Sequence, residues 1–541
     1  MVEASPNQDL NIKPSGTVSE VDQSRLAFLK AAGALAAVVA LGGLLEACEQ
    51  AGLVTPQPSP TFPSSNPTAG GPAGPELTST ATALPQPTFT ATATPAPTPT
   101  PTPTSTPAPT ATPLLRSERE RIAHLLRRAG FGASQNELRQ YEAMGLAGTV
   151  DYLLDYEQVD DNALETKLQS LNLDLTKIGD LQRWWIVRMV HSNRPLREKM
   201  TLFWHGLLTS GVSRVGRAEY MWKQNELFRQ QALGSFPVLL KAVSRDPAML
   251  IWLDSKSNRK SAPNENFARE LMELFSMGVG NYTEEDVRES ARAFTGWFLG
   301  NTGFTFDAAQ HDNGVKRFLG ESGPFTGDDV IDTIVRQPAT AYYICKKLLQ
   351  FFAYDSPDPS LLTTLRTTFM DSGYSIKAVM RAFLTSETFY ASGAYRSRIK
   401  SPTELVAGTL RTLGIATDGS SLPTLLTRMG QTLFDPPNVA GWTGGPNWIT
   451  SVTLLERVNF ANLIVTNRKS FDPRGMTGRA NPTAREVLDY FIGHLLDGNM
   501  APVLRTVMNT YADEAARTAA PDTAARSVAY LILGSPDFQL A

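Results

Sequence analysis

The chain has 541 residues, of which 42% are hydrophobic, and this is enough to bury a large core in two or three domains. A formal net charge of −3 excludes the basic footprint of a nucleic-acid-binding protein, so we expect no nucleic acid partner. The two cysteines, Cys48 and Cys345, cannot build a disulfide framework.

The N-terminus has the pattern of an export signal. Residues 31–45 form an apolar run without charge, the length of a signal-peptide hydrophobic region and short for a membrane span. The run ends in Leu45-Glu46-Ala47-Cys48, which is similar to a lipoprotein processing motif except at Glu46. We predict that residues 1–48 are an export signal and that Cys48 is lipidated, which anchors the protein to the membrane. The alternative is an uncleaved signal-anchor helix; both place most of the chain outside the cytoplasm.

A stalk-like segment follows the signal. From Thr55 to Pro113 the chain consists almost entirely of Thr, Pro, Ala and Ser. Because proline fixes φ and removes hydrogen-bond donors, this composition predicts an extended, disordered stalk over residues 49–115 rather than helix or sheet. Such stalks are often O-glycosylated. A spacer between a membrane anchor and a folded body fits the composition, as does a linker without a spacing function.

The remaining residues, 116–541, have the pattern of helices. Ser134 and Glu137 are spaced as a capping box that opens a helix. An apolar stripe within Arg197–Ser210 contains Met200 and Trp204 and predicts an amphipathic helix. Similar stripes predict helices over residues 341–352, 376–390, 403–413, 453–464, 485–496 and 524–533.

One segment departs from the helical pattern. Phe304-Thr305-Phe306 alternates as a strand does, Asn313-Gly314 is typical of a hairpin turn, and Val315–Leu319 can return as a second strand. The sequence therefore predicts an all-α fold, a large multi-helix globular domain with one small β-hairpin insertion.

A charged segment, Asn264–Trp297, contains the first candidate site. A helix over residues 264–277 places Asn266, Glu270 and Glu273 on one narrow face, beside an apolar stripe. We expect this face at the edge of the core, where burial perturbs carboxylate pKa values. Two carboxylates on one face suit a divalent ion or an acid/base pair.

The alternative is that Glu270 and Glu273 pair with arginines such as Arg269 and Arg292 in a structural network. The next helix repeats the spacing with Glu285, Glu289 and Arg292, on the side opposite its apolar residues, so we expect these charges to face solvent.

Several segments in chain order resemble the bacterial domain-of-unknown-function 1800 family: His124–Gly132, Lys199–His205, Asn264–Trp297, His311-Asp312 with Lys316 and Gly320, and Pro437–Trp442. The resemblance covers most of residues 116–467 and implies an exported protein. Members are often encoded beside secreted proteins of the 1501 unknown-function family, which resemble alkaline phosphatases and sulfatases. The resemblance therefore implies a secreted partner of that kind and a function in the handling of surface glycans, although the family has no established reaction.

Two of the five histidines have polar surroundings in the sequence. His205 lies on the polar side of its predicted helix, and His311 with Asp312 lies at the predicted hairpin tip. If these residues meet Glu270 and Glu273, then Glu270, Glu273 and His205 form a catalytic group, and His311 and Asp312 are ligands of a divalent metal cofactor. The chain has no ligand spacing such as H-E-x-x-H, so hydrogen-bonded structural histidines are the alternative.

Aromatic loops give a competing hypothesis. Trp442 and Trp448 lie in a glycine-rich segment, and Trp297 ends a second aromatic turn. Tryptophan rings beside polar groups stack on sugar faces or anchor a protein partner, and they also fix loops to a core.

Standard catalytic motifs are missing from the sequence, including G-x-S-x-G, the P-loop and the dinucleotide-binding fingerprint. The lone Cys345 is expected to be a small buried hydrophobe. Two function classes remain: a binding or assembly module at the cell envelope that recognises a surface glycan or a secreted protein, and a hydrolase that uses a Glu/His/Asp cluster with or without a metal.

Overall fold

A computed structural model of the protein describes Leu115 and residues 117–541. The predicted export signal, the lipidation residue Cys48 and nearly all of the predicted stalk lie outside the described residues. Within the described part, no helix has both the length and the hydropathy that a membrane span requires.

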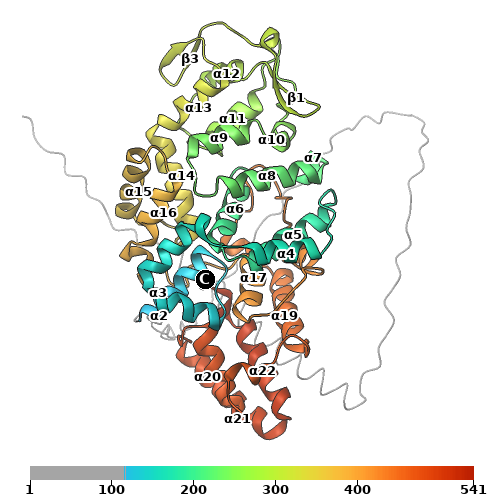
Figure 1. Ribbon diagram of the computed structural model, residues 1–541. Helices are drawn as coiled ribbons and strands as arrows, with labels where there is room; N and C mark the ends of the chain where they lie inside the picture. Colours follow the sequence, from blue (N-terminus) through green and yellow to red (C-terminus); the bar gives the residue numbers. More distant parts are fainter. Residues whose placement is uncertain (1–114, 116) are drawn as a thin grey trace, which may run out of the picture. The chain divides into compact units, whose positions relative to one another are not determined.

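The described residues form an all-α domain, as predicted, with two small two-stranded sheets (Figure 1). The first helices are α2 (Glu118–Ala129), α3 (Gln135–Leu154), α4 (Asn162–Ser170), α5 (Ile178–His191), α6 (Pro195–Leu207), α7 (Val212–Val215), α8 (Ala218–Gln230), α9 (Phe236–Ser244), α10 (Pro247–Trp252), α11 (Glu265–Glu273) and α12 (Glu284–Ala293). After the strands come α13 (Gly327–Arg336), α14 (Pro338–Phe352), α15 (Pro359–Asp371), α16 (Ile376–Leu384), α17 (Pro402–Thr412), α18 (Leu422–Arg428), α19 (Ser451–Thr466), α20 (Ala484–Leu495), α21 (Pro502–Thr518), α22 (Pro521–Gly534) and α23 (Pro536–Gln539).

Local signals in the sequence explain where many helices begin. The Ser134 hydroxyl accepts from the backbone N–H of Glu137, and the Glu137 carboxylate accepts from the backbone N–H of Ser134 at 2.8 Å, which confirms the predicted capping box of α3. The helix predicted over residues 376–390 ends earlier, at Leu384, and a short 3-10 turn follows at Glu387–Tyr390.

The strands form two hairpins instead of the single predicted one. β1 (Trp297–Gly300) pairs with β2 (Gly303–Phe306), and β3 (Lys316–Phe318) pairs with β4 (Glu321–Gly323), both antiparallel. The predicted pairing across Asn313-Gly314 is wrong, because the Asp312 carboxylate accepts from the Gly314 N–H at 2.8 Å and fixes a loop there. The turn of the second hairpin is Leu319-Gly320, where both residues have positive φ, as a two-residue hairpin turn requires.

The first and last helices of the described chain meet in one region. α2 packs against α3 and α6, α17 packs against α5, and α20 packs against α21 and α22. Figure 1 marks the C-terminus close to α2, and Ala541 indeed shares a cavity with Ala123 of α2. Residues more than 400 positions apart in the sequence therefore lie together in the interior.

Candidate functional site

The predicted carboxylate pair lies on α11 at the edge of the core. Glu270 and Glu273 are both half-buried. Burial and the neighbouring Glu273 raise the pKa of Glu270 above its ordinary value. Glu273 accepts a hydrogen bond from the Tyr282 hydroxyl at 2.5 Å.

The arginines of this segment do not pair with Glu270 and Glu273, although the structural-network alternative predicted that they would. Arg269 pairs with Glu284 at 2.7 Å, and Arg292 pairs with Glu289 and with Asp312, both at 2.8 Å. The predicted pairing of Glu270 and Glu273 with Arg269 and Arg292 is therefore wrong.

Helix α12 holds the β3–β4 hairpin with its acidic face. Glu289 accepts from the Arg317 N–H at 3.0 Å, and Asp286 accepts from the Leu319 N–H at 2.7 Å. Glu285 is exposed as expected, but Glu289 and Arg292 are half-buried against the hairpin rather than solvated. The periodicity of the sequence predicted that Glu289 and Arg292 lie on one face of the helix, but it could not predict that the β3–β4 hairpin covers this face.

His205 is a core residue, contrary to its expected place on a polar helix face. Its side chain is enclosed by the rings of Trp185, Phe434 and Trp442, with centroids 5.4, 5.7 and 5.6 Å away. Burial lowers the pKa of His205 to about 3, so the imidazole is neutral at physiological pH.

His311 and Asp312 hold the loop before β3. His311 is buried, and its Nδ1 lies 2.8 Å from the Thr295 carbonyl oxygen. The Arg292 guanidinium holds the pKa of Asp312 at about 2. In the part of the chain that the structure describes, no three His, Cys, Asp or Glu side chains are grouped so that they could hold a metal ion. His311 and Asp312 thus share one loop beside Thr295, whereas His205 has different neighbours, the rings of Trp185, Phe434 and Trp442.

The three candidate tryptophans differ in exposure. Trp297 is buried and packs edge-on against Phe294 and Phe304, each with ring centroids 5.0 Å away, and Trp448 is also buried. Trp442 is half-buried over His205. Of these rings, that of Trp442 presents the largest part to solvent.

Cys345 is fully buried, and burial raises the pKa of its thiol to about 12, in line with the expected small hydrophobe.

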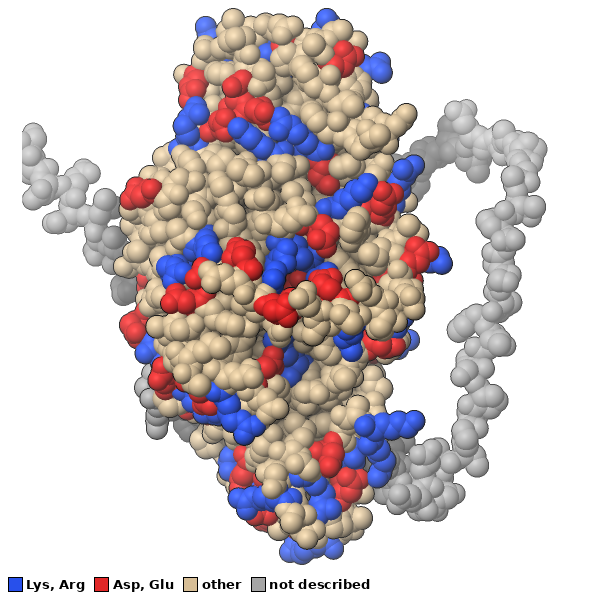
Figure 2. All heavy atoms as spheres, in the orientation of Figure 1, with Lys and Arg blue, Asp and Glu red and all other residues tan. Residues whose placement is uncertain are grey.

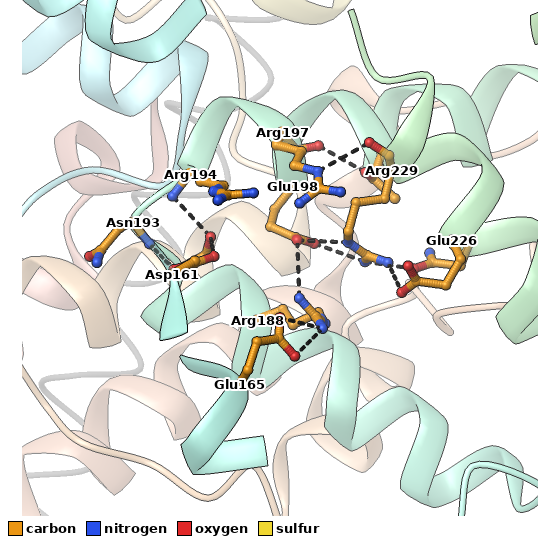
Figure 3. Close-up of polar contacts among 12 residues, drawn as sticks. Asp161, Glu165, Arg188, Asn193, Arg194, Arg197, Glu198, Glu226 and Arg229 are labelled. Carbon is orange, nitrogen blue, oxygen red and sulfur yellow. Dashed lines mark hydrogen bonds and ion pairs between the residues drawn. The ribbon is translucent and has the colours of Figure 1, made fainter. Parts of the chain in front are cut away.

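A first charge cluster, with the buried pair Glu198 and Arg229 at its centre, lies between α4, α5, α6 and α8 (Figure 3). We name it the Glu198 cluster; it comprises Glu165, Arg188, Arg197, Glu198, Glu226 and Arg229. The Arg229 guanidinium donates to both Glu198 oxygens, at 2.8 and 3.0 Å, and ion-pairs with Glu226 at 2.6 Å. Arg188 ion-pairs with Glu165 at 2.8 Å. Three carboxylates face three guanidinium groups, so the cluster is balanced.

A second cluster surrounds a cavity of about 40 Å³ that sequence reasoning missed. We name it the basic cavity. Its walls come from α2, the loop that follows it, α3, α17 with the preceding Lys400, α20 and the C-terminal segment. The lining residues are Ala123, Leu126, Arg127, Phe131, Gly132, Ala133, Leu138, Lys400, Glu404, Gly408, Thr412, His494, Leu495, Phe538 and Ala541.

Cations outnumber carboxylates around the basic cavity. Two buried carboxylates are paired there: Glu404 with Lys199 at 2.5 Å and Asp497 with Arg127 at 2.6 Å. A third, the more exposed Asp355, lies 3.9 Å from Arg398. In the described part of the chain, no carboxylate is in ion-pair distance of four further cations, which are Arg128, Arg396, Lys400 and Arg457.

These four cations are buried and bind neutral oxygens instead. The Arg128 Nε donates to the Phe352 carbonyl at 2.6 Å, and the Lys400 Nζ donates to the Phe538 carbonyl at 2.6 Å. Both terminal nitrogens of Arg128 and the Nδ1 of His494 are buried without a hydrogen-bond partner among the described residues. A buried, unpaired charge or donor is costly, so this arrangement has an unmet capacity for an anion.

Burial and the excess of positive charge lower the pKa values of several titratable groups around the basic cavity. Burial, followed by repulsion from Arg127 and Arg396, lowers the pKa of Lys400 well below its ordinary value. Burial lowers the pKa of Arg128 to about 9. Burial opposes ionisation of Glu404, but Lys199 and Arg398 outweigh it and hold the pKa of that carboxyl below its ordinary value. The positive excess is internal, because charges of both signs are interspersed on the surface drawn in Figure 2.

Parts of the basic cavity have signals in the sequence. Arg127 and Arg128 follow His124 after two leucines, and the run from Arg396 to Lys400 carries three cations in five residues. A basic run normally indicates a solvated surface. Only the packing of α2 against α17, α20 and the C-terminal segment turns these cations inward.

Fold and cavity together define an all-α protein with an internal cavity that is surrounded by an excess of cations. A family model described as a protein of unknown function, DUF1800, matches residues 124–540, and the chain belongs to this family. The match includes all the residues that line the cavity except Ala123 and Ala541. No curated protein and no solved structure matches the chain.

Proposed function

We propose that the protein is a binding module at the outer side of the cell envelope and that its basic cavity binds an anionic group. The observation that carries this proposal is the set of buried cations without a carboxylate partner, Arg128, Arg396, Lys400 and Arg457. An anion that enters the cavity supplies the missing counter-charge and hydrogen-bond acceptors at once. An acidic group of a surface glycan has this chemistry, which agrees with the resemblance-based expectation.

Binding is better supported than hydrolysis. The hydrolase hypothesis requires that His205, Glu270 and Asp312 meet at one place. His205 is enclosed by aromatic rings, Glu270 lies on α11, and Asp312 is paired with Arg292. Each has surroundings of its own, so the geometry favours a function based on recognition.

Calorimetric titration of the full-length chain tests the proposal. We expect heats of binding for phosphate, acetate and glucuronate at constant ionic strength, and none for glucose. Lys400→Gln should weaken anion binding at least ten-fold, whereas Arg505→Gln, on the exposed face of α21, should leave it unchanged. Equal binding by wild type and Lys400→Gln, or no binding of any anion, would contradict the proposal.

The envelope location is tested separately. Cys48 lies outside the described residues, and its lipidation is the predicted mode of attachment. In cells, Cys48→Ala should move the protein from the detergent phase to the aqueous phase in a detergent partition experiment. Retention of the variant in the detergent phase would instead support an uncleaved signal-anchor helix.

A further inference from the structure

The C-terminal segment forms one wall of the basic cavity and is held there by Lys400. The Lys400 N–H donates to the Gln539 carbonyl at 2.9 Å, and its ammonium lies 3.7 Å from the centroid of the Phe538 ring. Arg457 binds the same segment, with Nη1 at 3.2 Å from the Gln539 side-chain oxygen. One wall of the cavity is therefore fixed to the cations that an anion would contact.

The size of the cavity limits what enters it. Its volume of about 40 Å³ corresponds to roughly three water positions. A compact charged group fits this space, whereas a whole sugar ring does not. The group that binds is therefore either a small free anion or the end of a larger molecule that stays outside.

The charge and the donors determine which compact group fits best. A carboxylate carries one negative charge and offers two oxygens, whereas a phosphoryl group carries up to two charges and offers three or more acceptor oxygens. The cavity lining provides donors on three sides, from Arg127 of α2, Lys400 before α17 and His494 of α20. Three further buried cations without a carboxylate partner, Arg128, Arg396 and Arg457, lie outside this lining but add to the positive charge around it.

We infer that the basic cavity binds a doubly charged phosphoryl group, as inorganic phosphate or as a phosphate monoester, with Arg127, Lys400 and His494 as donors. This inference rests on the proposed function and narrows its ligand class. Nδ1 of His494 lacks a partner among the described residues, and Nε2 lies 2.8 Å from the Thr412 carbonyl oxygen. The carbonyl requires the proton on Nε2, so Nδ1 donates to the anion when the ring is doubly protonated. Burial lowers the pKa of His494, and a phosphoryl group beside Nδ1 opposes that shift by its charge, so the cationic ring is the form that donates.

Lys400 connects the ligand to the C-terminal segment. Its Nζ already donates to the Phe538 carbonyl and has further protons available for an anion, because an ammonium carries three. A bound phosphoryl group therefore strengthens the set of contacts that holds Phe538 over the cavity, and we expect binding to protect this segment from exchange and proteolysis.

The test compares four probes on the full-length chain by calorimetry at pH 7.5 and constant ionic strength: inorganic phosphate, glucose 6-phosphate, glucuronate and glucose. We expect phosphate or glucose 6-phosphate to bind at least ten-fold more tightly than glucuronate. Tighter binding of glucose 6-phosphate identifies a monoester of a larger molecule as the ligand; tighter binding of inorganic phosphate identifies the free anion.

Variants distinguish failure of this inference from failure of the proposed function. Lys400→Gln and His494→Gln should each weaken phosphate binding at least ten-fold, with Arg505→Gln as the matched surface control. Glucuronate binding as tight as phosphate binding overturns the phosphoryl inference and leaves the anion-binding function intact. Absence of binding for every anion overturns both.

One additional measurement separates a loss of binding from a loss of stability. The phosphate-dependent rise in melting temperature, which wild type should show and Lys400→Gln should lack, reports binding even if the variant is less stable. An equal rise in both proteins would overturn the inference.

Discussion

The Glu198 cluster and the basic cavity both have a buried centre, and they differ in charge balance. In the Glu198 cluster each carboxylate has a guanidinium within ion-pair distance, and only the half-buried Arg197 binds a neutral oxygen instead (Figure 3). Around the basic cavity, Arg128, Lys400 and Arg457 bind only neutral oxygens among the described residues. A balanced cluster fixes helices to one another, whereas an unbalanced one stores a capacity to bind.

The two clusters also differ in the sequence separation of the residues that form them. The Glu198 cluster draws on residues 165–229, which form successive helices. The basic cavity combines α2 with residues beyond 396 and with Phe538 near the C-terminus. The proposed binding site therefore exists only when the two ends of the described chain are packed together, whereas the Glu198 cluster depends on a short part of it.

Loss of one partner in the balanced cluster has the largest expected effect. Glu198→Gln leaves the Arg229 guanidinium, which is 1% exposed, without its main counter-charge. Breaking a buried pair in this way costs about 3–5 kcal/mol of unfolding free energy. Urea unfolding followed by circular dichroism measures the loss. Glu387→Gln is the matched control, because its carboxylate is 83% exposed, and it should cost less than about 1 kcal/mol. Equal losses in the two variants would show that the balance of the cluster contributes nothing.

His205 is a third case, because it is a buried titratable group that has aromatic neighbours and no counter-ion within the described part of the chain. The pKa of His205 is about 3 in the folded state and ordinarily 6.5, so on acidification the unfolded state takes up the proton first. Stability that is fully present above pH 6.5 is therefore lost as the pH falls towards 3. At pH 5 the neutral, buried His205 has lowered the free energy of unfolding by about 2 kcal/mol relative to pH 7.

The measurement is the free energy of unfolding at pH 7 and pH 5 for wild type and His205→Phe. The phenyl ring keeps the aromatic contacts with Trp185 and Phe434 but cannot titrate. The acid-induced loss should be about 2 kcal/mol smaller in the variant, with the other histidines unchanged in both proteins. An identical loss would contradict the assignment of a neutral, buried His205.

Structure that depends on neighbouring residues could be predicted from the sequence, whereas contacts between residues far apart in the chain could not. The capping box at Ser134 and the periodic stripe around Met200 are local, and the structure has the helices they predict. The face of α11 that carries Glu270 was also predictable from 3.6-residue periodicity. The hairpin pairing was wrong because a side-chain contact, Asp312 with Gly314, outweighed the turn propensity of Asn313-Gly314.

The burial of polar side chains was the main property that could not be predicted from the sequence. His205 lies on the polar side of α6 by periodicity, but rings from α5 and from the segment at residues 434–442 cover that side. The cations from Arg396 to Lys400 have the composition of a surface run, and the C-terminal segment covers them. In both cases the covering residues are distant in sequence, and no local pattern reports them.

Removal of a cation should have opposite consequences in the two clusters. Arg229→Met in the Glu198 cluster should cost about 3 kcal/mol, because it leaves the buried Glu198 with only the 4.0 Å ion pair to Arg188. Lys400→Met removes a charge that lacks a carboxylate partner, so it should be neutral or stabilising by about 1 kcal/mol in phosphate-free buffer. Calorimetric melting of both variants, with and without phosphate, checks the signs. A loss of several kcal/mol in Lys400→Met without phosphate would show that the cavity is balanced by a group of the protein itself.

The smallest effect is expected where charges are balanced but exposed. Arg505 ion-pairs with Asp489 at 2.5 Å, and the two side chains are 36% and 49% exposed. Water screens such a pair, so Arg505→Gln should change the unfolding free energy by less than about 0.5 kcal/mol and should leave anion binding unaltered. Added NaCl should also shift the stability of wild type and variant equally. If Arg505→Gln cost as much as Glu198→Gln, pairing alone would stabilise this protein irrespective of burial, and the contrast between the Glu198 cluster and the basic cavity would lose its physical basis.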